Sequence, residues 1–133
     1  MIDKKFLKKI IAQNITDLRV ISALAHKSKI RQDNIKYLKK NKIFLLPIER
    51  IDTNNIRTKK KINSIIKFDF IEESKSKNIN QYNKKNVLEL LAIEQFKRNN
   101  LLEIILLFSN NAAITLTTEV IDVTLEDITN NND

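Results

Sequence analysis

Three apolar runs in the last third of the chain constrain its fold more than any other feature. The runs Val87–Phe96, Leu101–Phe108 and Ala112–Leu125 are separated by polar breaks at Lys97–Asn100 and Ser109–Asn111. Short polar breaks favour antiparallel strands, because an antiparallel pair needs only a few connecting residues. The sequence therefore predicts a β-meander whose strands are apolar on both faces, as in the interior of a sheet or the wall of a barrel.

The third run changes phase near Glu119–Val120. Its first apolar residues, Ile114 and Leu116, occupy even positions, whereas Ile121 and Val123 occupy odd ones. Successive strand residues point to opposite faces, so a one-residue slip indicates a β-bulge or a sharp bend. We expect a strand that turns a corner here.

Length and residue types limit the chemistry that the chain can carry. The 133 residues predict one globular domain over residues 1–128 and a polar C-terminal tail over 129–133. The chain has no Cys and one His, so it offers no disulfide, thiolate nucleophile or His-based metal cluster. We expect no cofactor and no metal.

The chain also has no Gly. Asn tolerates the left-handed backbone conformation next best, and it stands where turns are expected. These positions are Asn41, Asn54–Asn55, Asn99–Asn100 and Asn110–Asn111. Without Gly, neither a dinucleotide-binding fingerprint nor a P-loop is present.

No apolar run approaches the roughly 20 residues that a transmembrane helix needs. The segment Met1–Ile15 lacks the uninterrupted apolar core of a secretory signal peptide. We therefore expect a cytoplasmic protein without a membrane partner.

One amphipathic helix is predicted over Thr16–Lys27, where apolar residues recur at helical spacing. Asn14 or Thr16 can serve as its N-cap. Lys27 and Lys29 would place positive charge at its C-terminal end, where the helix dipole favours it.

The rest of the first half is predicted to be mainly strand. Lys4–Ile11 fits either a strand or a helical face, and the two alternatives stay open. Ile30–Leu38 and Ile43–Ile51 predict a hairpin with Asn41 in its turn. Pro47 has no N–H to donate, so its strand should be an edge, bulged or broken there. Further strands are expected at Lys61–Ile71 and around Lys75–Ile79.

These elements predict an α+β fold. One N-terminal amphipathic helix would pack on a curved antiparallel sheet or a partly closed β-barrel of six to eight strands. A pleckstrin-homology-like barrel is one such arrangement, although its usual C-terminal helix has no counterpart in this sequence.

Nine short segments carry a resemblance to a known family by their order and spacing. They are Asp17–Leu18, Ile21–Ala23, Ile35–Leu38, Phe44–Leu46, Arg50–Asp52, Ile66–Asp69, Val87–Ile93, Ala113–Leu116 and Leu125–Ile128. In these segments the chain resembles the alphaproteobacterial family known as domain of unknown function 2948. It departs from that family at Asn110–Asn111, where a Gly-rich turn is usual, and after Asp52, where a Trp is missing. The resemblance implies a complete domain and no assigned activity.

Charge is unevenly distributed along the chain. The net charge is +8; residues 1–61 hold 17 Lys and Arg against 5 Asp and Glu, and residues 62–133 hold 7 against 11. This asymmetry points to a polyanion partner, although a bias toward A/T-rich codons also explains the many lysines. The candidate polyanion-contacting residues are Lys36, Lys39, Lys40, Lys42, Arg57, Lys59, Lys60 and Lys61.

Other polar residues favour structural roles over catalytic ones. His26 is expected to contact carbonyls at the end of the helix. Arg50 and Asp52 share one strand face and are expected to form a local or cross-strand ion pair. Three carboxylate pairs have no ligand spacing typical of a metal site: Glu72–Glu73, Glu119 with Asp122, and Glu126–Asp127.

Three functional hypotheses follow. A non-enzymatic protein-interaction module, which binds a protein through a sheet edge or the helix-side groove, agrees best with a complete core and no catalytic motif. A nucleic-acid-binding protein that uses the basic N-terminal half is the alternative. An enzyme is the least supported of the three, and a homodimer formed through an uncovered strand is compatible with each.

Overall fold

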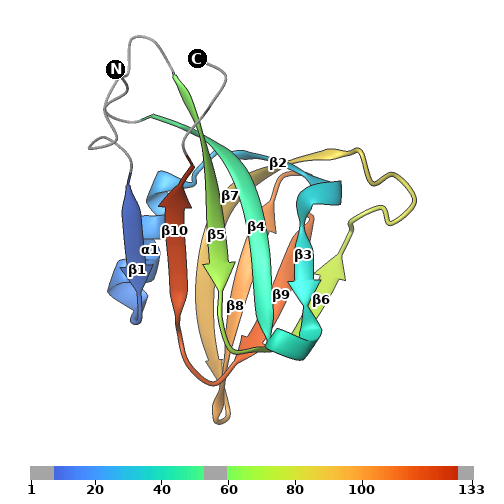
Figure 1. Ribbon diagram of the computed structural model, residues 1–133. Helices are drawn as coiled ribbons and strands as arrows, with labels where there is room; N and C mark the ends of the chain where they lie inside the picture. The colour runs from blue at the N-terminus through green and yellow to red at the C-terminus, as the bar shows by residue number, and fades with distance from the viewer. Residues whose placement is uncertain (1–7, 53–59, 129–133) are drawn as a thin grey trace.

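The computed structural model describes residues 8–52 and 60–128, which form ten antiparallel strands and one α-helix (Figure 1). The strands are β1 Lys9–Ala12, β2 Lys29–Arg31, β3 Lys36–Leu38, β4 Ile43–Ile51, β5 Lys61–Phe68, β6 Ile71–Lys77, β7 Val87–Arg98, β8 Leu101–Phe108, β9 Ala113–Thr118 and β10 Val123–Asp127. The helices are α1 Ile15–Leu24 and two 3-10 turns, η2 Gln32–Asn34 and η3 Lys39–Asn41. The prediction of six to eight strands was too low because two predicted strands, Ile30–Leu38 and Ala112–Leu125, each divide in two.

The strands form one antiparallel sheet that does not close. Their order is β1-β10-β5-β4-β2-β7-β8-β9-β6, with β3 paired to β4, so β1 and β6 are its two ends. The predicted β7–β8–β9 meander and the β3–β4 hairpin are both confirmed. The alternative prediction of a partly closed barrel is not confirmed, because the sheet stays open. The likeness to a pleckstrin-homology barrel stays a prediction.

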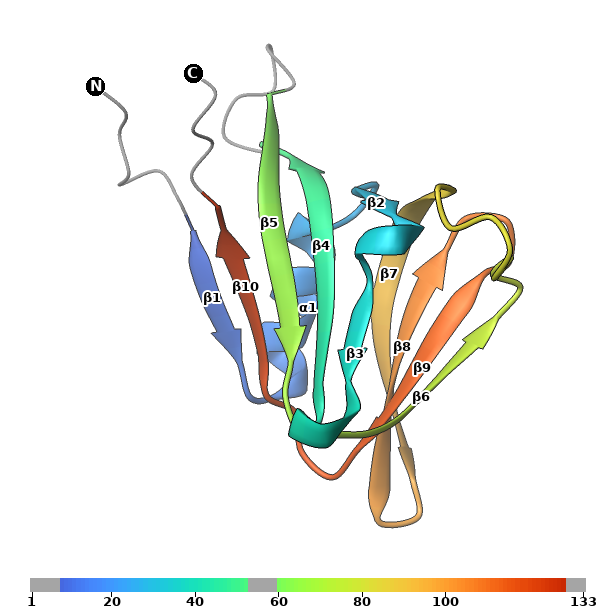
Figure 2. The ribbon, with the colours of Figure 1, turned by 45° about the vertical axis from the view of Figure 1, so that its right-hand side comes forward.

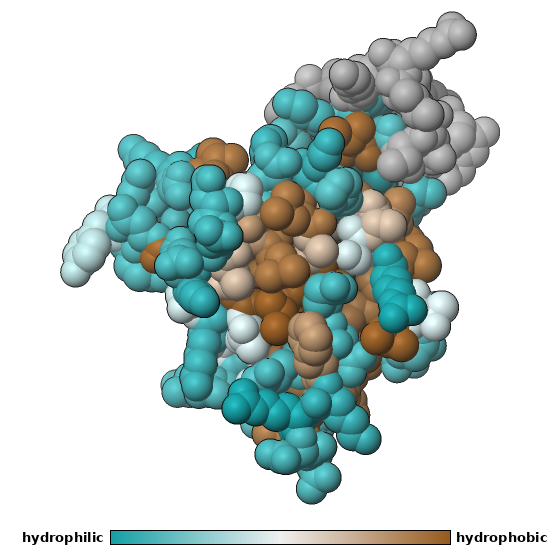
Figure 3. Space-filling view, turned by 180° about the vertical axis from the view of Figure 1, so that it is seen from behind, coloured by the Kyte–Doolittle hydropathy of each residue, from teal (hydrophilic) through white to brown (hydrophobic). Residues whose placement is uncertain are grey.

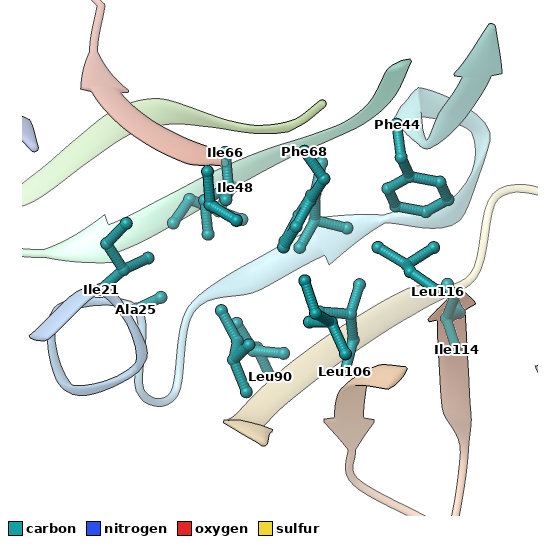
Figure 4. Packing of buried hydrophobic residues seen from close by; sticks show 14 of the residues in the cluster. Ile21, Ala25, Phe44, Ile48, Ile66, Phe68, Leu90, Leu106, Ile114 and Leu116 are labelled. Atoms are coloured by element: carbon teal, nitrogen blue, oxygen red, sulfur yellow. The ribbon is translucent and has the colours of Figure 1, made fainter. Parts of the chain in front are cut away.

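The sheet folds into two walls that face each other across the core (Figure 2). One wall is β1-β10-β5-β4 and the other is β7-β8-β9-β6; the three-residue β2 joins them by pairing with both β4 and β7. Figure 4 shows Ile66 and Phe68 of the first wall opposite Leu90 and Leu106 of the second. Each such fully buried side chain contributes roughly 1.5–3 kcal/mol relative to an exposed one.

Helix α1 packs against β7 and β1, and it is shorter than predicted. Its N-cap is Asn14, whose side chain accepts a hydrogen bond from the Asp17 N–H at 2.8 Å. Leu18 and Ile21 are buried in the core. The helix ends at Leu24 because the N–H of Lys27 donates to β7 at 2.7 Å instead of to a helical carbonyl. Lys27 and Lys29 therefore lie beyond the helix, whose last turn holds no basic residue, so the predicted positive charge in that turn is not found.

Pro47 lies at a local edge inside the sheet, as its missing N–H predicts. The N–H of Asp52 donates to the Lys60 carbonyl, so even-numbered residues of β4 point their backbone groups toward β5. The nitrogen of Pro47 consequently points to the opposite side of β4. There β3 pairs with Ile43–Leu45 and β2 pairs with Glu49, which leaves Pro47 in the gap between two short partners.

The predicted corner near Glu119–Val120 is where the chain passes from one wall to the other. Strand β9 ends at Thr118 next to β8, and β10 begins at Val123 between β1 and β5. Asn also replaces Gly in several turns, since Asn99, Asn110 and Asn111 all have positive φ angles. In the β3–β4 turn the left-handed residue is Lys42 rather than the predicted Asn41.

Candidate functional site

A fully buried ion pair joins β4 to β10, across β5, in the first wall. Arg50 on β4 binds the carboxylate of Asp127 on β10 through two hydrogen bonds, Nε to Oδ1 at 2.9 Å and Nη2 to Oδ2 at 2.6 Å. The Ser64 hydroxyl on β5 donates to Oδ1 at 2.6 Å, and the backbone N–H of Lys8 donates to Oδ2 at 2.8 Å. Four neighbouring segments of the wall therefore meet at one carboxylate.

Asp127 is held in its charged form by these partners. Burial acts to raise its pKa, but the hydrogen bonds from Arg50, Ser64 and Lys8, with the charge of Arg50, hold the pKa below its ordinary value. A carboxylate with all its partners inside the protein is suited to fixing strands rather than to proton transfer. The cross-strand ion pair predicted for Arg50 is confirmed, and its partner is Asp127 on β10.

The six predicted polyanion-contacting residues that the structure describes fall into two separate groups. Lys36 lies on β3, and Lys39, Lys40 and Lys42 surround the η3 turn before β4. Lys60 and Lys61 lie at the far end of β4, where Lys61 pairs with Ile51 (Figure 1). The nine residues of β4 separate the two groups by roughly 26 Å. Arg57 and Lys59 lie outside the described residues.

Two of these lysines already have carboxylate partners. Lys42 pairs with Glu72 at 3.1 Å, and Lys61 pairs with Glu49 at 3.6 Å. Exposed ion pairs of this kind contribute little to stability, but they reduce the positive charge that a ligand would meet.

The other candidate residues also occupy structural positions. The exposed His26 donates through Nδ1 to the Leu91 carbonyl at 2.9 Å. Glu73 pairs with Lys75 at 3.8 Å, and Glu89 pairs with Lys29 at 2.9 Å, an interaction that lowers the pKa of Glu89. In residues 8–52 and 60–128, no group of three His, Cys, Asp or Glu side chains is placed to hold a metal ion.

A hollow of about 340 Å³ lies between β3, which pairs with β4, and β6, one end of the open sheet. Tyr37 and Phe44 line it, with ring centroids 6.3 Å apart. The Tyr37 hydroxyl donates to the Ile71 carbonyl at 2.9 Å and so links the two strands. Burial raises the pKa of Tyr37, and the nearby carboxylates of Glu72 and Glu73 raise it further.

The outward side of β7 and β8 exposes an apolar surface. Its large side chains are 37% to 55% exposed, and Ile105 adds a partly buried one between them. We name this surface the rear apolar face; its exposed members are Val87, Leu91, Phe96, Leu101 and Leu107. Seen from behind, apolar atoms gather in the middle of the molecule (Figure 3). A small groove of about 130 Å³ between β7 and α1 adjoins it, lined by Phe96 and Ile15.

A bulge in β7 creates this face, which the sequence pattern did not predict. Strand alternation places Leu91 and Phe96 on opposite sides. The register between β7 and β8 shifts between Leu90 and Ala92. Before this bulge the buried residue is Leu90, and after it the next buried residue is Ile93, three positions later instead of two. Both Leu91 and Phe96 consequently face outward.

The family model for "Protein of unknown function (DUF2948)" matches residues 8–133, nearly the whole chain. The chain belongs to the DUF2948 family. The resemblance that the sequence predicted is thereby confirmed. Neither the curated proteins nor the solved structures include a significant match. None of the helices in the described part of this DUF2948 chain is long and apolar enough to cross a membrane.

Proposed function

We propose that this DUF2948 protein is a non-enzymatic protein-interaction module that docks a partner on its rear apolar face. The observation that supports this proposal is the concentration of exposed apolar side chains on one side of β7 and β8. Contiguous exposed apolar surface is costly in water, and it is typical of protein-binding sites. The groove between β7 and α1 adjoins this surface and extends the apolar area that a partner could cover.

The charges around the face favour a partner that is basic as well as apolar. Glu94 is exposed and stands opposite Ile105 in the β7–β8 register. Glu103 is paired with Arg98 at 3.7 Å, whereas none of the described ion pairs involves Glu94. A partner segment with leucine-like side chains and a lysine or arginine would cover the apolar area and pair with this carboxylate.

Two synthetic amphipathic peptides test this proposal, one of leucine and lysine and one of leucine and glutamate. We expect the basic peptide to bind with one-to-one stoichiometry in a calorimetric titration and the acidic peptide to bind more weakly. Backbone amide shifts should change around Leu91 and Leu107 in a two-dimensional NMR spectrum. Leu107→Ser should weaken binding about tenfold, as expected for an apolar residue near the centre of an interface.

Ile11→Ser is the matched control, because Ile11 is 54% exposed on the outward side of β1. Equal affinity for the two peptides, or equal losses in the Leu107 and Ile11 variants, would contradict the proposal. A dimer in sedimentation equilibrium that only Leu107→Ser disrupts would also contradict it, because the occupant would then be a second copy of the chain.

Nucleic-acid binding through the basic N-terminal half is the second candidate. The excess of 17 basic over 5 acidic residues in residues 1–61 favours it. Affinity for labelled DNA and RNA that falls steeply with salt would support it, and no binding at low salt would refute it.

The cytoplasmic location stays a prediction.

A further inference from the structure

The connection between β6 and β7 carries a second concentration of positive charge, in the half of the chain that is acidic overall. Residues 74–88 contain four lysines and no Asp or Glu: Lys75, Lys77, Lys84 and Lys85. Lys75 pairs with Glu73 at 3.8 Å, but both side chains are more than half exposed. Among the described carboxylates, none pairs with the other three lysines. We name residues 74–86 the β6–β7 arm, which projects beside β6 in Figure 1.

The arm is held in a defined shape by bonds to the body of the protein. Ile79 packs against the hydrophobic core. The Asn78 side chain donates to the Asn111 carbonyl at 2.9 Å, and the Gln32 side chain donates to the Asn80 carbonyl at 2.8 Å. The arm can therefore present its side chains without first paying the full entropy of ordering a flexible loop.

Two consecutive turns place an aromatic ring at the tip of this arm. The Asn83 N–H donates to the Asn80 carbonyl at 3.3 Å, and the Asn86 N–H donates to the Asn83 carbonyl at 3.2 Å. Tyr82 stands in the first turn, where its N–H donates to the Asn80 side chain at 2.9 Å. Its side chain is 100% exposed, and the two central residues of the next turn are lysines.

These features match the requirements of single-stranded nucleic-acid binding. Such sites combine an aromatic ring on which a base stacks with cations that follow the phosphates. Amide side chains can hydrogen-bond to the edges of unpaired bases. Two exposed amides of the arm, Asn83 and Asn86, are available for such bonds, whereas the side chains of Asn78, Asn80 and Gln81 already hydrogen-bond within the protein.

We infer that the β6–β7 arm binds single-stranded nucleic acid, with one base stacked on Tyr82 and phosphates contacted by Lys84 and Lys85. Lys75 and Lys77 do not belong to this site, because strand alternation places them on the opposite face of β6 from Ser74 and Ser76, which line the same hollow as Lys84. A lipid surface fits the arm less well, since its tip carries amides where an interfacial anchor carries further apolar side chains. The inference is independent of the rear apolar face.

The test is a fluorescence-anisotropy titration of the full chain with labelled oligo-dT, oligo-U and a matched duplex. We expect tighter binding of the single strands than of the duplex. Tyr82→Ala should weaken single-strand binding roughly five- to hundredfold, whereas Tyr82→Phe should retain it, because stacking needs the ring and not the hydroxyl. Lys84→Ala/Lys85→Ala should lower the slope of log affinity against log salt by about 1.4, as expected when two phosphate contacts are lost.

Lys39→Ala/Lys40→Ala is the matched control, because it removes the same charge from a distant turn. Tyr82 is fully exposed, so its replacement does not threaten the fold. Unchanged affinity in Tyr82→Ala, equal affinity for duplex and single strand, or an equal loss in the control would overturn the inference. Binding to vesicles of phosphatidylcholine and phosphatidylglycerol that Tyr82→Ala abolishes, with no oligonucleotide binding, would also overturn it and identify a membrane contact.

Discussion

At the scale of single residues, the most consequential contact is the buried pair between Arg50 and Asp127. Replacing Arg50 by Met keeps much of the side chain's volume but leaves a buried carboxylate without its cation. We expect Arg50→Met to lower the free energy of unfolding by about 3–5 kcal/mol, measured by urea denaturation. Lys61→Ala, which removes an exposed partner of Glu49, should cost less than about 1 kcal/mol. Losses of similar size in the two variants would contradict a structural role for the buried pair.

The same pair makes stability depend on pH in the acid range. Because the pKa of Asp127 in the folded chain lies below its ordinary value of 3.8, its stabilising contribution is complete above that value. The contribution is lost as pH falls through the lowered pKa. We expect the free energy of unfolding of Asp127→Asn to fall less steeply below about pH 3.8 than that of the unchanged chain.

Glu126→Gln is the control for this measurement, because the neighbouring Glu126 is exposed. It should keep the full dependence on pH, and a flattened profile in this variant would show that Asp127 is not the titrating group. The sequence placed Arg50 on a strand and Asp127 just after one, but it could not pair them. They are 77 residues apart, and their contact depends on β10 joining β5 in one register.

At the scale of elements, Pro47 shows how a strand tolerates proline inside a sheet. Its nitrogen points to the gap between β2 and β3, so restoring an N–H there gains no described partner. We expect Pro47→Ala to change the free energy of unfolding by at most about 1 kcal/mol, mainly through the unfolded chain. Ile48→Pro would remove an N–H that points to β5 and should prevent folding, as judged by circular dichroism and solubility. A large loss in Pro47→Ala would contradict the assigned direction of its nitrogen.

Elements that depend on neighbouring residues were predictable, and those that depend on distant ones were not. The β7–β8–β9 meander follows from apolar runs and short polar breaks, and the end of β9 from a slip in alternation. The end of α1 depends on a bond from Lys27 to β7, and the rear apolar face depends on a bulge opposite β8. Neither feature can be read from the residues around it, because each depends on contacts with a segment that is distant in the sequence.

At the scale of the whole molecule, the fold separates charges that the sequence placed together. The described candidate lysines of the first half divide between the two ends of β4, whereas the β6–β7 arm places Lys84 and Lys85 directly after the turn that holds the exposed Tyr82. Composition alone predicted the first group and missed the second, since the arm lies in the half with the negative net charge. The position of an aromatic side chain relative to the lysines distinguishes the two groups, and total charge does not.

Combined variants can test whether the two lysine groups at the ends of β4 contribute independently to oligonucleotide binding. Lys39→Ala/Lys40→Ala and Lys60→Ala/Lys61→Ala remove charge at points roughly 26 Å apart, more than twice the screening length of about 10 Å at 0.1 M salt. We expect each to weaken oligonucleotide binding slightly, and the fourfold variant to show the sum of the two effects within roughly 0.5 kcal/mol. Anisotropy titrations with labelled oligo-dT at constant salt provide the four affinities. Coupling beyond that limit would mean that both groups contact the same few phosphates, which the extended β4 between them does not allow.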